Sequence, residues 1–374
     1  MSAAERRDAR RRTAAPAVVA VLLALLLAAY LYQSGRLQRL GARAAAPGGP
    51  LQVFFTTPAL RYPDIPAQRP ASPLLQALLA DLDAARASVD LASFDLDLAP
   101  VVDALLRAKA RGVTVRAIVD SENLDTPEVS EQAGRLQRAG VPVRFDRREP
   151  FMHDKIVVID GAIVWAGSWN LTENDTWRNN NNMLRFASRQ LAADYAREFE
   201  QMFGERFGAA KRGGTPYPRV RVGAARVEVY FSPEDGVARH VIERVRAARQ
   251  SVTFLAFSFT SDAIADAMIA RAGAGVPVRG VFESNNAGGS GAAYGRLRAN
   301  GLDVLEDGNC YNLHHKVIVI DARTVIAGSY NFTASAERDN DENLVIIDDP
   351  QLARAYMDEF ERVYAQAQAP TRCR

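Results

Sequence analysis

The sequence has no broad excess of basic residues. Its 374 residues carry a net charge of only +2. The first 50 residues hold eight arginines against two acidic residues, a charge of +6, which leaves −4 for the remainder. Proteins dedicated to nucleic-acid binding carry an excess of lysine and arginine. The composition therefore argues against that class, although it leaves room for a local basic patch.

Long hydrophobic runs are absent except for one near the N-terminus. Residues 13–32 contain no charged side chain, and twenty helical residues span about 30 Å, the hydrocarbon core of a bilayer. Five arginines precede the run and three follow it. This bias predicts a single-pass anchor in the inner (cytoplasmic) membrane of a bacterium, with the remainder of the chain outside. The sequence indicates no protein partner.

A cleaved signal peptide is the alternative interpretation of this segment. Residues 42–44 (Ala-Arg-Ala) form a loose small-x-small cleavage site. We favour the anchor, because the uncharged run is long for a signal peptide and the cleavage site lies well beyond its end. Both alternatives export the remainder of the chain.

Cysteine is scarce as well, with only Cys310 and Cys373. An exported location permits a disulfide bond between them. The sequence does not fix the distance between the two residues. A Cys310–Cys373 disulfide and two free thiols therefore remain equally open.

After residue 50 the sequence is duplicated. The segment from His153 to Asp160 recurs from His314 to Asp321, 161 positions later. Both copies begin with His-x-Lys and end with Asp after four aliphatic residues. Matches at the same shift continue beyond this segment, which excludes chance: Gly167, Ser168, Asn170 and Asn182 correspond to Gly328, Ser329, Asn331 and Asn343.

Each copy has the same predicted order of strands and helices. Apolar strands at 88–94 and 251–257 follow helices at 74–87 and 237–249, and a hairpin follows each His-x-Lys segment. We therefore predict an α/β fold with two duplicated α/β sandwich domains related by pseudo-twofold symmetry. The predicted boundaries are a basic segment, anchor and linker at 1–50, a first domain at 51–207, a linker at 208–225 and a second domain at 226–368.

Two of the four histidines indicate chemistry. His153 and His314 occupy the same position of the repeat, each two residues before a lysine, Lys155 or Lys316. Side chains two residues apart on a strand project from one face, and lysine is rarely buried without a partner. An imidazole beside an ammonium group suits an anion that must be attacked. We expect the pseudo-twofold axis to bring both pairs into a single active site.

Further polar residues of the repeat are candidates for the same site. Asn170 and Asn331, together with the lysines, can donate hydrogen bonds to the oxygens of an anion and neutralise developing charge. Ser168 and Ser329 either donate their hydroxyls to the site or cap the helices that follow them; the sequence favours neither role.

The remaining matched residues are expected to support the site. Gly167 and Gly328 remove side chains where the backbone must come close. Asp160 and Asp321 lie on the opposite strand face from the histidines and lysines. We expect them to fix the hairpin or to form a salt bridge rather than to take part in the chemistry.

The pattern His-x-Lys-x4-Asp, followed by Gly-Ser-x-Asn, resembles the phospholipase D superfamily. Both copies are intact, and the resemblance covers residues 51–365. The segment from Asn331 to Glu337 is similar to the nuclease-like branch. The resemblance implies two-step phosphoryl transfer without a metal or cofactor: one histidine forms a phosphohistidine, and the other protonates the leaving oxygen and then activates water. The sequence shows no carboxylate cluster that would hold a metal.

One departure from the family pattern separates the two histidines. In the family, an acidic residue late in the motif orients the histidine. Glu342 stands 28 residues after His314, whereas the matching position after His153 is Asn181. A carboxylate partner favours the imidazolium form and an amide does not. The sequence therefore predicts that Glu342 supports His314 as the general acid and that His153 is the neutral nucleophile.

The resemblance leaves several functions open. We expect phospholipase D-type hydrolysis of a phospholipid, with the membrane as a partner through the N-terminal segment. The alternatives are an exported, metal-independent endonuclease acting on nucleic acid, a cardiolipin synthase-like phosphatidyltransferase, and a catalytically silent binding module. The single hydrophobic span argues against the transferase, and two complete motifs argue against the silent module.

Overall fold

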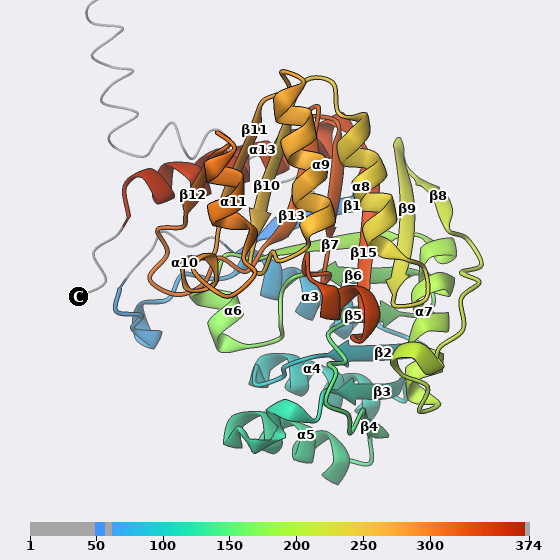
Figure 1. Ribbon diagram of the computed structural model, residues 1–374. Helices are drawn as coiled ribbons and strands as arrows, with labels where there is room; N and C mark the ends of the chain where they lie inside the picture. The colour runs from blue at the N-terminus through green and yellow to red at the C-terminus, as the bar shows by residue number, and fades with distance from the viewer. Residues whose placement is uncertain (1–48, 57–61, 371–374) are drawn as a thin grey trace, which may run out of the picture. The chain divides into compact units, whose positions relative to one another are not determined.

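The computed structural model describes residues 49–56 and 62–370 (Figure 1). The hydrophobic segment predicted at 13–32 lies outside these residues, as does Cys373. Within the described part of the chain, no helix combines the length and the apolar character needed to cross a membrane. Cys310 is disulfide-bonded.

The first half forms a seven-stranded sheet in the order β1-β7-β6-β5-β2-β3-β4. Strands β2, β3 and β4 run parallel to one another, and the remaining neighbours are antiparallel. The elements are β1 (Leu51–Phe55), α3 (Pro73–Ala84), β2 (Ser88–Ser93), α4 (Ala99–Ala110), β3 (Thr114–Val119), α5 (Pro127–Arg138), β4 (Val143–Phe145), β5 (Lys155–Ile159), β6 (Ile163–Gly167), α6 (Glu173–Trp177), β7 (Asn182–Ala187) and α7 (Arg189–Phe203), with short 3-10 turns at Pro66–Gln68 and Glu122–Asp125.

The second half repeats this order with one strand added at the edge. Its eight-stranded sheet runs β12-β11-β10-β13-β14-β15-β9-β8. The elements are β8 (Arg219–Val222), β9 (Ala225–Ser232), α8 (Val237–Ala247), β10 (Val252–Ala256), α9 (Asp262–Gly273), β11 (Val278–Phe282), α10 (Ser284–Ala287), α11 (Ala293–Ala299), β12 (Asp303–Glu306), β13 (Lys316–Ile320), β14 (Thr324–Gly328), α12 (Ala334–Arg338), β15 (Glu342–Asp348) and α13 (Pro350–Gln368).

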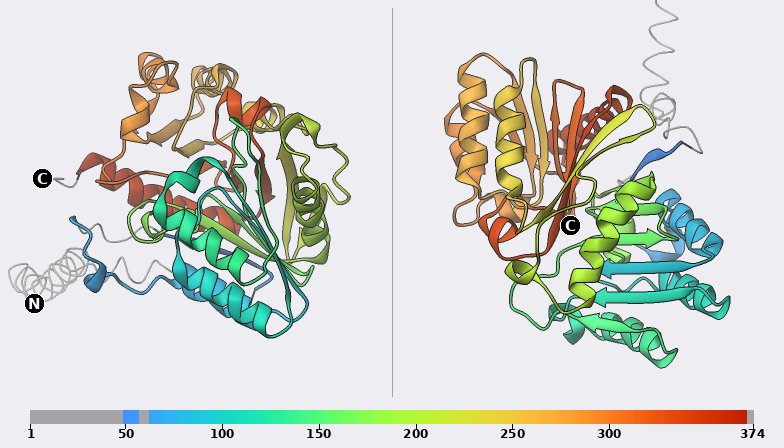
Figure 2. Two further views of the ribbon diagram at one scale, coloured as in Figure 1. Left: turned by 90° about the horizontal axis from the view of Figure 1, so that it is seen from below. Right: turned by 90° about the vertical axis from the view of Figure 1, so that its right-hand side faces the viewer.

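The two sheets face each other across a shared apolar core. Helices α7 and α13 contribute to this core together with aliphatic residues from both sheets. The other long helices, α3, α4 and α5 in one half and α8 and α9 in the other, pack on the outer faces (Figure 2). The chain is therefore an α/β protein built from two duplicated, sheet-containing domains.

Short pairings across the interface follow the predicted pseudo-twofold relationship. Met152 forms an isolated bridge with Asp341, and Asn180 forms one with Leu313. The shift of 161 that relates the two copies of the sequence converts the first pair into the second. These bridges join the segment before each motif strand to the segment before the last strand of the other half. They bring the two motifs together.

The segment predicted as a linker at 208–225 is more ordered than its sequence suggests. It begins with a 3-10 turn at Gly208–Ala210 and ends in β8, which pairs with β9. The buried ammonium of Lys211 forms ion pairs with Glu198, Glu234 and Asp341 and donates to the carbonyl of Ser232 at 2.8 Å. The linker is thus attached to both halves through one buried cation.

Candidate active site

The first His-x-Lys pair is held at the start of β5. The backbone N–H of His153 donates to the carbonyl of Asp341 at 2.9 Å. The ammonium of Lys155 donates back to the carbonyl of His153 at 2.7 Å and lies 4.9 Å from the ring centroid of Phe94. The same ring contacts the His153 imidazole edge-on at 4.9 Å. One aromatic side chain therefore positions both the imidazole and the cation.

The second pair repeats this geometry at the start of β13. The N–H of His314 donates to the carbonyl of Asn180 at 2.9 Å, and Lys316 donates to the carbonyl of His314 at 2.8 Å. Phe257 lies 4.6 Å from the imidazole of His314 and 4.6 Å from the ammonium of Lys316. The four side chains of the two pairs are all buried. Both lysines therefore reach the interior, as an anion site requires.

The two pairs share one electrostatic environment. Burial, followed by the charges of Lys155 and Lys316, lowers the pKa of His153 well below its ordinary value. Burial and the same two lysines do the same for His314. Burial also lowers the pKa of Lys155 to about 8. Each lysine thus acts on the histidine of the other half as well as on its own. A bound anion would offset the unfavourable burial of the two ammonium groups.

Glu342 contacts a different histidine from the one predicted. Its Oε2 lies 2.8 Å from Nδ1 of His153, within hydrogen-bond distance, and its side chain is buried. The prediction that Glu342 supports His314, the histidine of its own half, is wrong. The bridges between the halves exchange the partners, because β15 begins beside the loop that carries His153. Burial raises the pKa of the Glu342 carboxyl to about 8.

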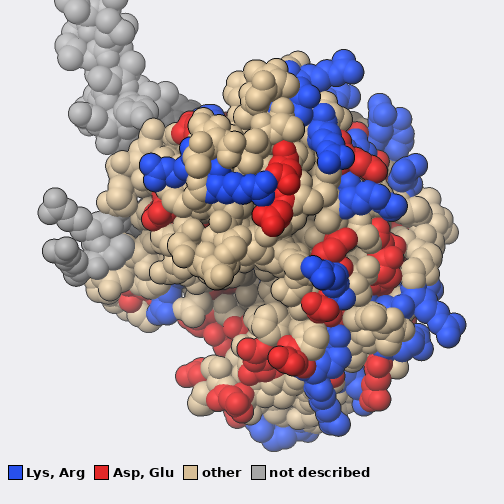
Figure 3. Space-filling view, viewed as in Figure 1, with Lys and Arg blue, Asp and Glu red and all other residues tan. Residues whose placement is uncertain are grey.

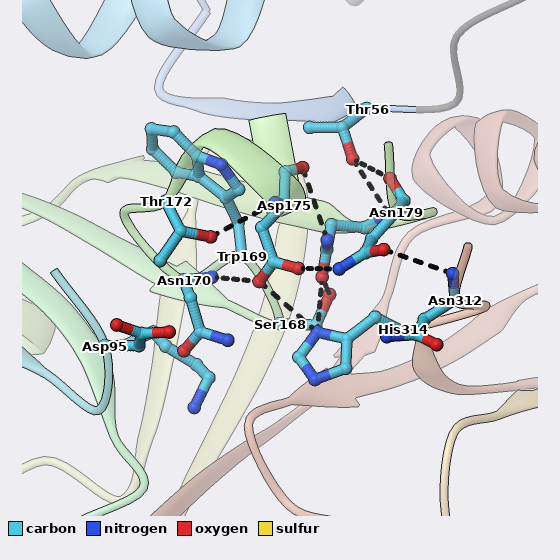
Figure 4. A network of polar contacts seen from close by, with 12 residues as sticks. Thr56, Asp95, Ser168, Trp169, Asn170, Thr172, Asp175, Asn179, Asn312 and His314 are labelled. Atoms are coloured by element: carbon cyan, nitrogen blue, oxygen red, sulfur yellow. Dashed lines mark hydrogen bonds and ion pairs between the residues drawn. The ribbon is translucent and has the colours of Figure 1, made fainter. Parts of the chain in front are cut away.

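His314 has an amide and a carboxylate near the same ring nitrogen (Figure 4). Its Nδ1 lies 2.8 Å from Oδ1 of Asn181 and 3.5 Å from Oδ2 of Asp175. Since both oxygens are acceptors, Nδ1 carries a hydrogen, and Nε2 is the ring nitrogen left to exchange a proton with a bound group. The hydroxyl of Ser168 donates to the same Asn181 oxygen at 2.9 Å.

The matched serines do not cap the helices that follow them, which was one of their two predicted roles. Ser168 orients the amide that contacts His314, and its Oγ also accepts from the N–H of Asn182 at 3.0 Å. Ser329 accepts from the N–H of Asn343 at 3.0 Å in the same way. The caps of α6 and α12 are instead Thr172 and Thr333. The serines therefore support the residues around the histidines.

Asn170 and Asn331 are placed at equivalent positions in the two halves. Both carry a buried Oδ1 that has no hydrogen-bond partner. Buried polar atoms are nearly always satisfied in folded proteins, so these amides stand in a position to interact with a bound group. Figure 4 shows the amide of Asn170 beside Asp95, whose Oδ1 also lacks a partner.

The matched glycines and aspartates lie where close approach and turns require them. A side chain at Gly167 or Gly328 would collide with the carbonyl of Asn182 or Asn343. Asp160 accepts hydrogen bonds from the backbone N–H groups of residues 86–88 at 2.7 to 3.2 Å. Asp321 makes the equivalent contacts with residues 249–251. Both aspartates thus anchor a hairpin turn away from the histidines.

Sequence reasoning missed two carboxylates of the site, Asp175 and Asp95. Asp175 corresponds to Ala336 in the repeat, and Asp95 corresponds to Ser258 at the shift of 163 that applies upstream. A signal was therefore present, because acidic residues in only one copy stand out once the halves are aligned. Among the described residues, no group of three or more histidine, cysteine or acidic side chains is arranged to hold a metal ion.

Both halves resemble the same known protein family. Residues 78–203 and 241–364 match the family model described as "Cardiolipin synthase, PLD-like domain". The chain is 34% identical over 119 residues to the mitochondrial cardiolipin hydrolase of Xenopus tropicalis, a match that covers 32% of this chain and 57% of that relative. It is 30% identical over 149 residues to a phospholipase D of Rickettsia bellii, which covers 38% of this chain and 74% of that relative.

A solved structure supports the same conclusion at the level of the fold. The phosphatidylserine synthase of Haemophilus influenzae Rd KW20 matches 78% of this chain and 84% of its own, with a TM-score of 0.58 and 13% identity. The likeness shows that the two proteins share a fold. With the family match in both halves and the two buried His-x-Lys pairs, these findings establish that the chain belongs to the phospholipase D superfamily.

Proposed function

We propose that the protein hydrolyses phosphodiesters through a covalent phosphohistidine. The observation that carries this proposal is the convergence of two buried imidazoles and two buried ammonium groups from opposite halves. The lysines neutralise the phosphoryl oxygens as negative charge develops. The side-chain amide nitrogens of Asn170 and Asn331, which are hydrogen-bond donors, supply further polar contacts for the same oxygens.

The first step forms one bond and breaks another. Nε2 of neutral His153 attacks phosphorus, the bond to the leaving oxygen breaks, and the imidazolium form of His314, protonated on both ring nitrogens, gives its Nε2 proton to that oxygen. In the second step His314 takes a proton from water, the water oxygen attacks phosphorus, and the bond to His153 breaks. The products are an alcohol and a phosphomonoester, and both histidines return to their starting forms.

The contact between Glu342 and His153 supports the nucleophile assignment on a new ground. Attack on phosphorus leaves the ring of His153 phosphorylated on Nε2 and protonated on Nδ1, and therefore positively charged. The Glu342 oxygen at 2.8 Å from Nδ1 stabilises this charge and fixes the tautomer before the attack. The role of His153 thus rests on stabilisation of the intermediate rather than on the lack of a carboxylate.

A phospholipid is the substrate that the observations favour. The two relatives described above are called a cardiolipin hydrolase and a phospholipase D. Burial, followed by neighbouring carboxylates that include Glu173 and Glu128, raises the pKa of Asp97, and burial raises that of Asp95 to about 6. Acidic side chains also gather below the hollow between the halves in Figure 3. Such carboxylates repel a long polyanion more strongly than a single headgroup.

The proposed location is the outer side of a bacterial inner membrane. The uncharged segment 13–32, the arginines before it and the disulfide-bonded Cys310 support this placement. A reporter fused after Pro50 tests it. An exported reporter retained with the membrane fraction is the expected result. A reporter that is active only in the cytosol would exclude export, and a shortened soluble exported protein would identify a cleaved signal.

The test of activity compares substrates under one condition. The full-length protein in detergent is incubated in excess EDTA with phosphatidylcholine, phosphatidylglycerol or cardiolipin vesicles and, separately, with plasmid DNA. We expect release of a lipid headgroup alcohol by the wild type and none by His153→Ala. Cleavage of DNA without lipid hydrolysis would replace the substrate class with nucleic acid. If the protein cleaves neither the lipids nor the DNA, the proposed function is refuted.

A further inference from the structure

We propose that Asp175 is the positioning residue of His314 and supplies the negative charge that Asn181 lacks. The proposal rests on the proposed function and deepens it, because it assigns a residue to the proton transfer. The carboxylate lies in the same half as Asn181 and acts on the histidine of the other half. It touches neither substrate nor reacting atoms and acts through the ring of His314.

Asp175 is fixed in place by two contacts to its carboxylate and one to its backbone. Its Oδ2 accepts the backbone N–H of Asn170 at 2.7 Å, and its Oδ1 accepts the side-chain amide of Asn179 at 2.6 Å. Thr172 caps α6 and accepts the N–H of Asp175 at 3.1 Å. With the side chain buried, Oδ2 stands 3.5 Å from Nδ1 of His314 (Figure 4). The carboxylate is therefore held where it can form an ion pair with His314 when the imidazole ring becomes positively charged.

The repeat shows that the two halves have exchanged the position of the carboxylate. At the position of Asn181 the second half carries Glu342, and at the position of Asp175 it carries Ala336. Each half therefore offers the opposite histidine one acidic residue, from β15 in one case and from α6 in the other. Each histidine therefore has one acidic side chain near its Nδ1, although the two acidic residues stand at different positions of the repeat.

The fold itself does not require an acidic residue at this position. The residue that caps α12, the helix with Ala336, is Thr333, with φ and ψ of −131° and 165°; the residue that caps α6 is Thr172, with −127° and 159°. Both threonines cap their helices in the same way. A small apolar residue is thus compatible with the local structure. The reason for Asp175 lies in what it faces.

The proposed chemistry gives both histidines a need for negative charge. His153 becomes cationic when it carries the phosphoryl group, and His314 is cationic before it protonates the leaving oxygen. Burial and the charges of Lys316 and Lys155 disfavour a cationic His314. An amide oxygen orients the ring but offers no net charge against two cations. A buried carboxylate at this distance offsets that repulsion.

Three variants of the full-length protein test the proposal. Asp175→Ala removes the carboxylate, and Asp175→Ala/Asn181→Glu rebuilds in the first half the arrangement of Ala336 and Glu342. Asp194→Ala is the matched control, because Asp194 is also buried and accepts a backbone N–H, from Tyr217 at 2.7 Å, away from the histidines. Each variant is assayed with a phospholipid and with a bis-nitrophenyl phosphodiester, whose leaving group needs no proton.

The expected pattern separates proton donation from structural damage. Asp175→Ala should lower kcat on the phospholipid by about 100-fold and slow the first-turnover release of nitrophenol from the nitrophenyl ester by less than about 10-fold. The double variant should recover most of the activity on the phospholipid, and Asp194→Ala should leave both activities near the wild-type values. Equal losses on both substrates, or no recovery in the double variant at an unchanged melting temperature, would overturn the proposal.

A second measurement does not depend on activity. The chain has four histidines, so the ring ¹⁵N resonances of His314 can be assigned by comparison with His314→Ala. These resonances should move in Asp175→Ala and return toward the wild-type values in the double variant. If the wild type cleaves neither substrate, the proposed function fails, whereas unmoved resonances in Asp175→Ala overturn the role of Asp175 alone.

Discussion

Oε2 of Glu342 lies 2.8 Å from Nδ1 of His153, although the two residues belong to different halves and are 189 positions apart in the sequence. The equivalent contact joins Asn181 to His314 over 133 positions. Each half therefore supplies one histidine and the partner of the other histidine. Neither half contains a complete set of the groups that the proposed reaction uses.

The two histidines should differ in covalent trapping. With a bis-nitrophenyl substrate, whose leaving group needs no proton, His314→Ala should still form a phosphoryl adduct on His153. His153→Ala should form none. Acid quenching followed by mass spectrometry of the peptides measures both outcomes. An adduct on His314 in the His153→Ala protein, with none on His153 in the His314→Ala protein, would reverse the assignment.

Glu342→Gln should lower activity while it preserves or raises stability. Burial raises the pKa of Glu342 from 4.5 to about 8, so the folded protein binds a proton that the unfolded chain has released. The ionised carboxylate therefore costs stability increasingly as pH rises from 4.5 to about 8. The melting temperature of Glu342→Gln relative to the wild type should increase over this range. A relative decrease over the same range would contradict the prediction.

The activity of the same variant should fall by about 100-fold, because Gln cannot stabilise the charged phosphohistidine. The loss should appear on the nitrophenyl ester as well as on the phospholipid, since both require attack by His153. This distinguishes Glu342→Gln from Asp175→Ala, which is expected to spare the nitrophenyl ester. The first-turnover burst of nitrophenol and steady-state kinetics on the phospholipid provide the comparison.

Activity should persist in excess EDTA. The two lysines supply the positive charge that a metal ion would otherwise provide, and the described residues hold no acidic or histidine cluster suited to one. The rate in a large excess of chelator should equal the rate without chelator to within about a factor of two. Loss of activity that a divalent ion restores would show that the mechanism differs.

Gly328→Ala should destabilise the protein by about 1–3 kcal/mol, because its methyl group would collide with the carbonyl of Asn343 and lie 2.9 Å from Cα of Leu344. Gly273→Ala in α9 is the matched control, since a methyl group there meets nothing within 4 Å. It should be neutral or stabilise by up to about 1 kcal/mol. Urea denaturation of both variants measures the difference, and equal stabilities would contradict the close approach at Gly328.

The sequence predicted the repeated elements of the fold because strong local signals mark them. The aliphatic run after each His-x-Lys forms β5 or β13, and Asp160 and Gly161 form the expected turn with φ of 52° and 56°. Strand β8 was assigned to a linker, although Arg219–Val222 alternates exposed and buried residues. Four residues next to a Pro-rich stretch are too short for a reliable periodicity.

The identity of the residues in the site was easier to predict than their contacts. The repeat singled out His153, Lys155 and their counterparts, because two matched pairs of rare, functional residues have no explanation in packing. It also singled out Glu342, yet it assigned this residue to the wrong histidine. Sequence order says nothing of which half provides a partner, since that depends on how the two sheets meet. The bridges at Met152 and Asn180 decide it.

The exchange of partners across the interface has a consequence for synthesis and for evolution. Glu342 opens β15, so the growing polypeptide acquires the carboxylate that contacts His153 only 189 residues after His153 itself has been made. A partly made or truncated product would carry a histidine without its carboxylate. In evolutionary terms, a substitution at Asp175 or Glu342 changes the environment of the histidine in the opposite domain. The two domains arose as copies of one sequence. A change in the acidic partner that one domain supplies now requires a compatible change around the histidine of the other domain.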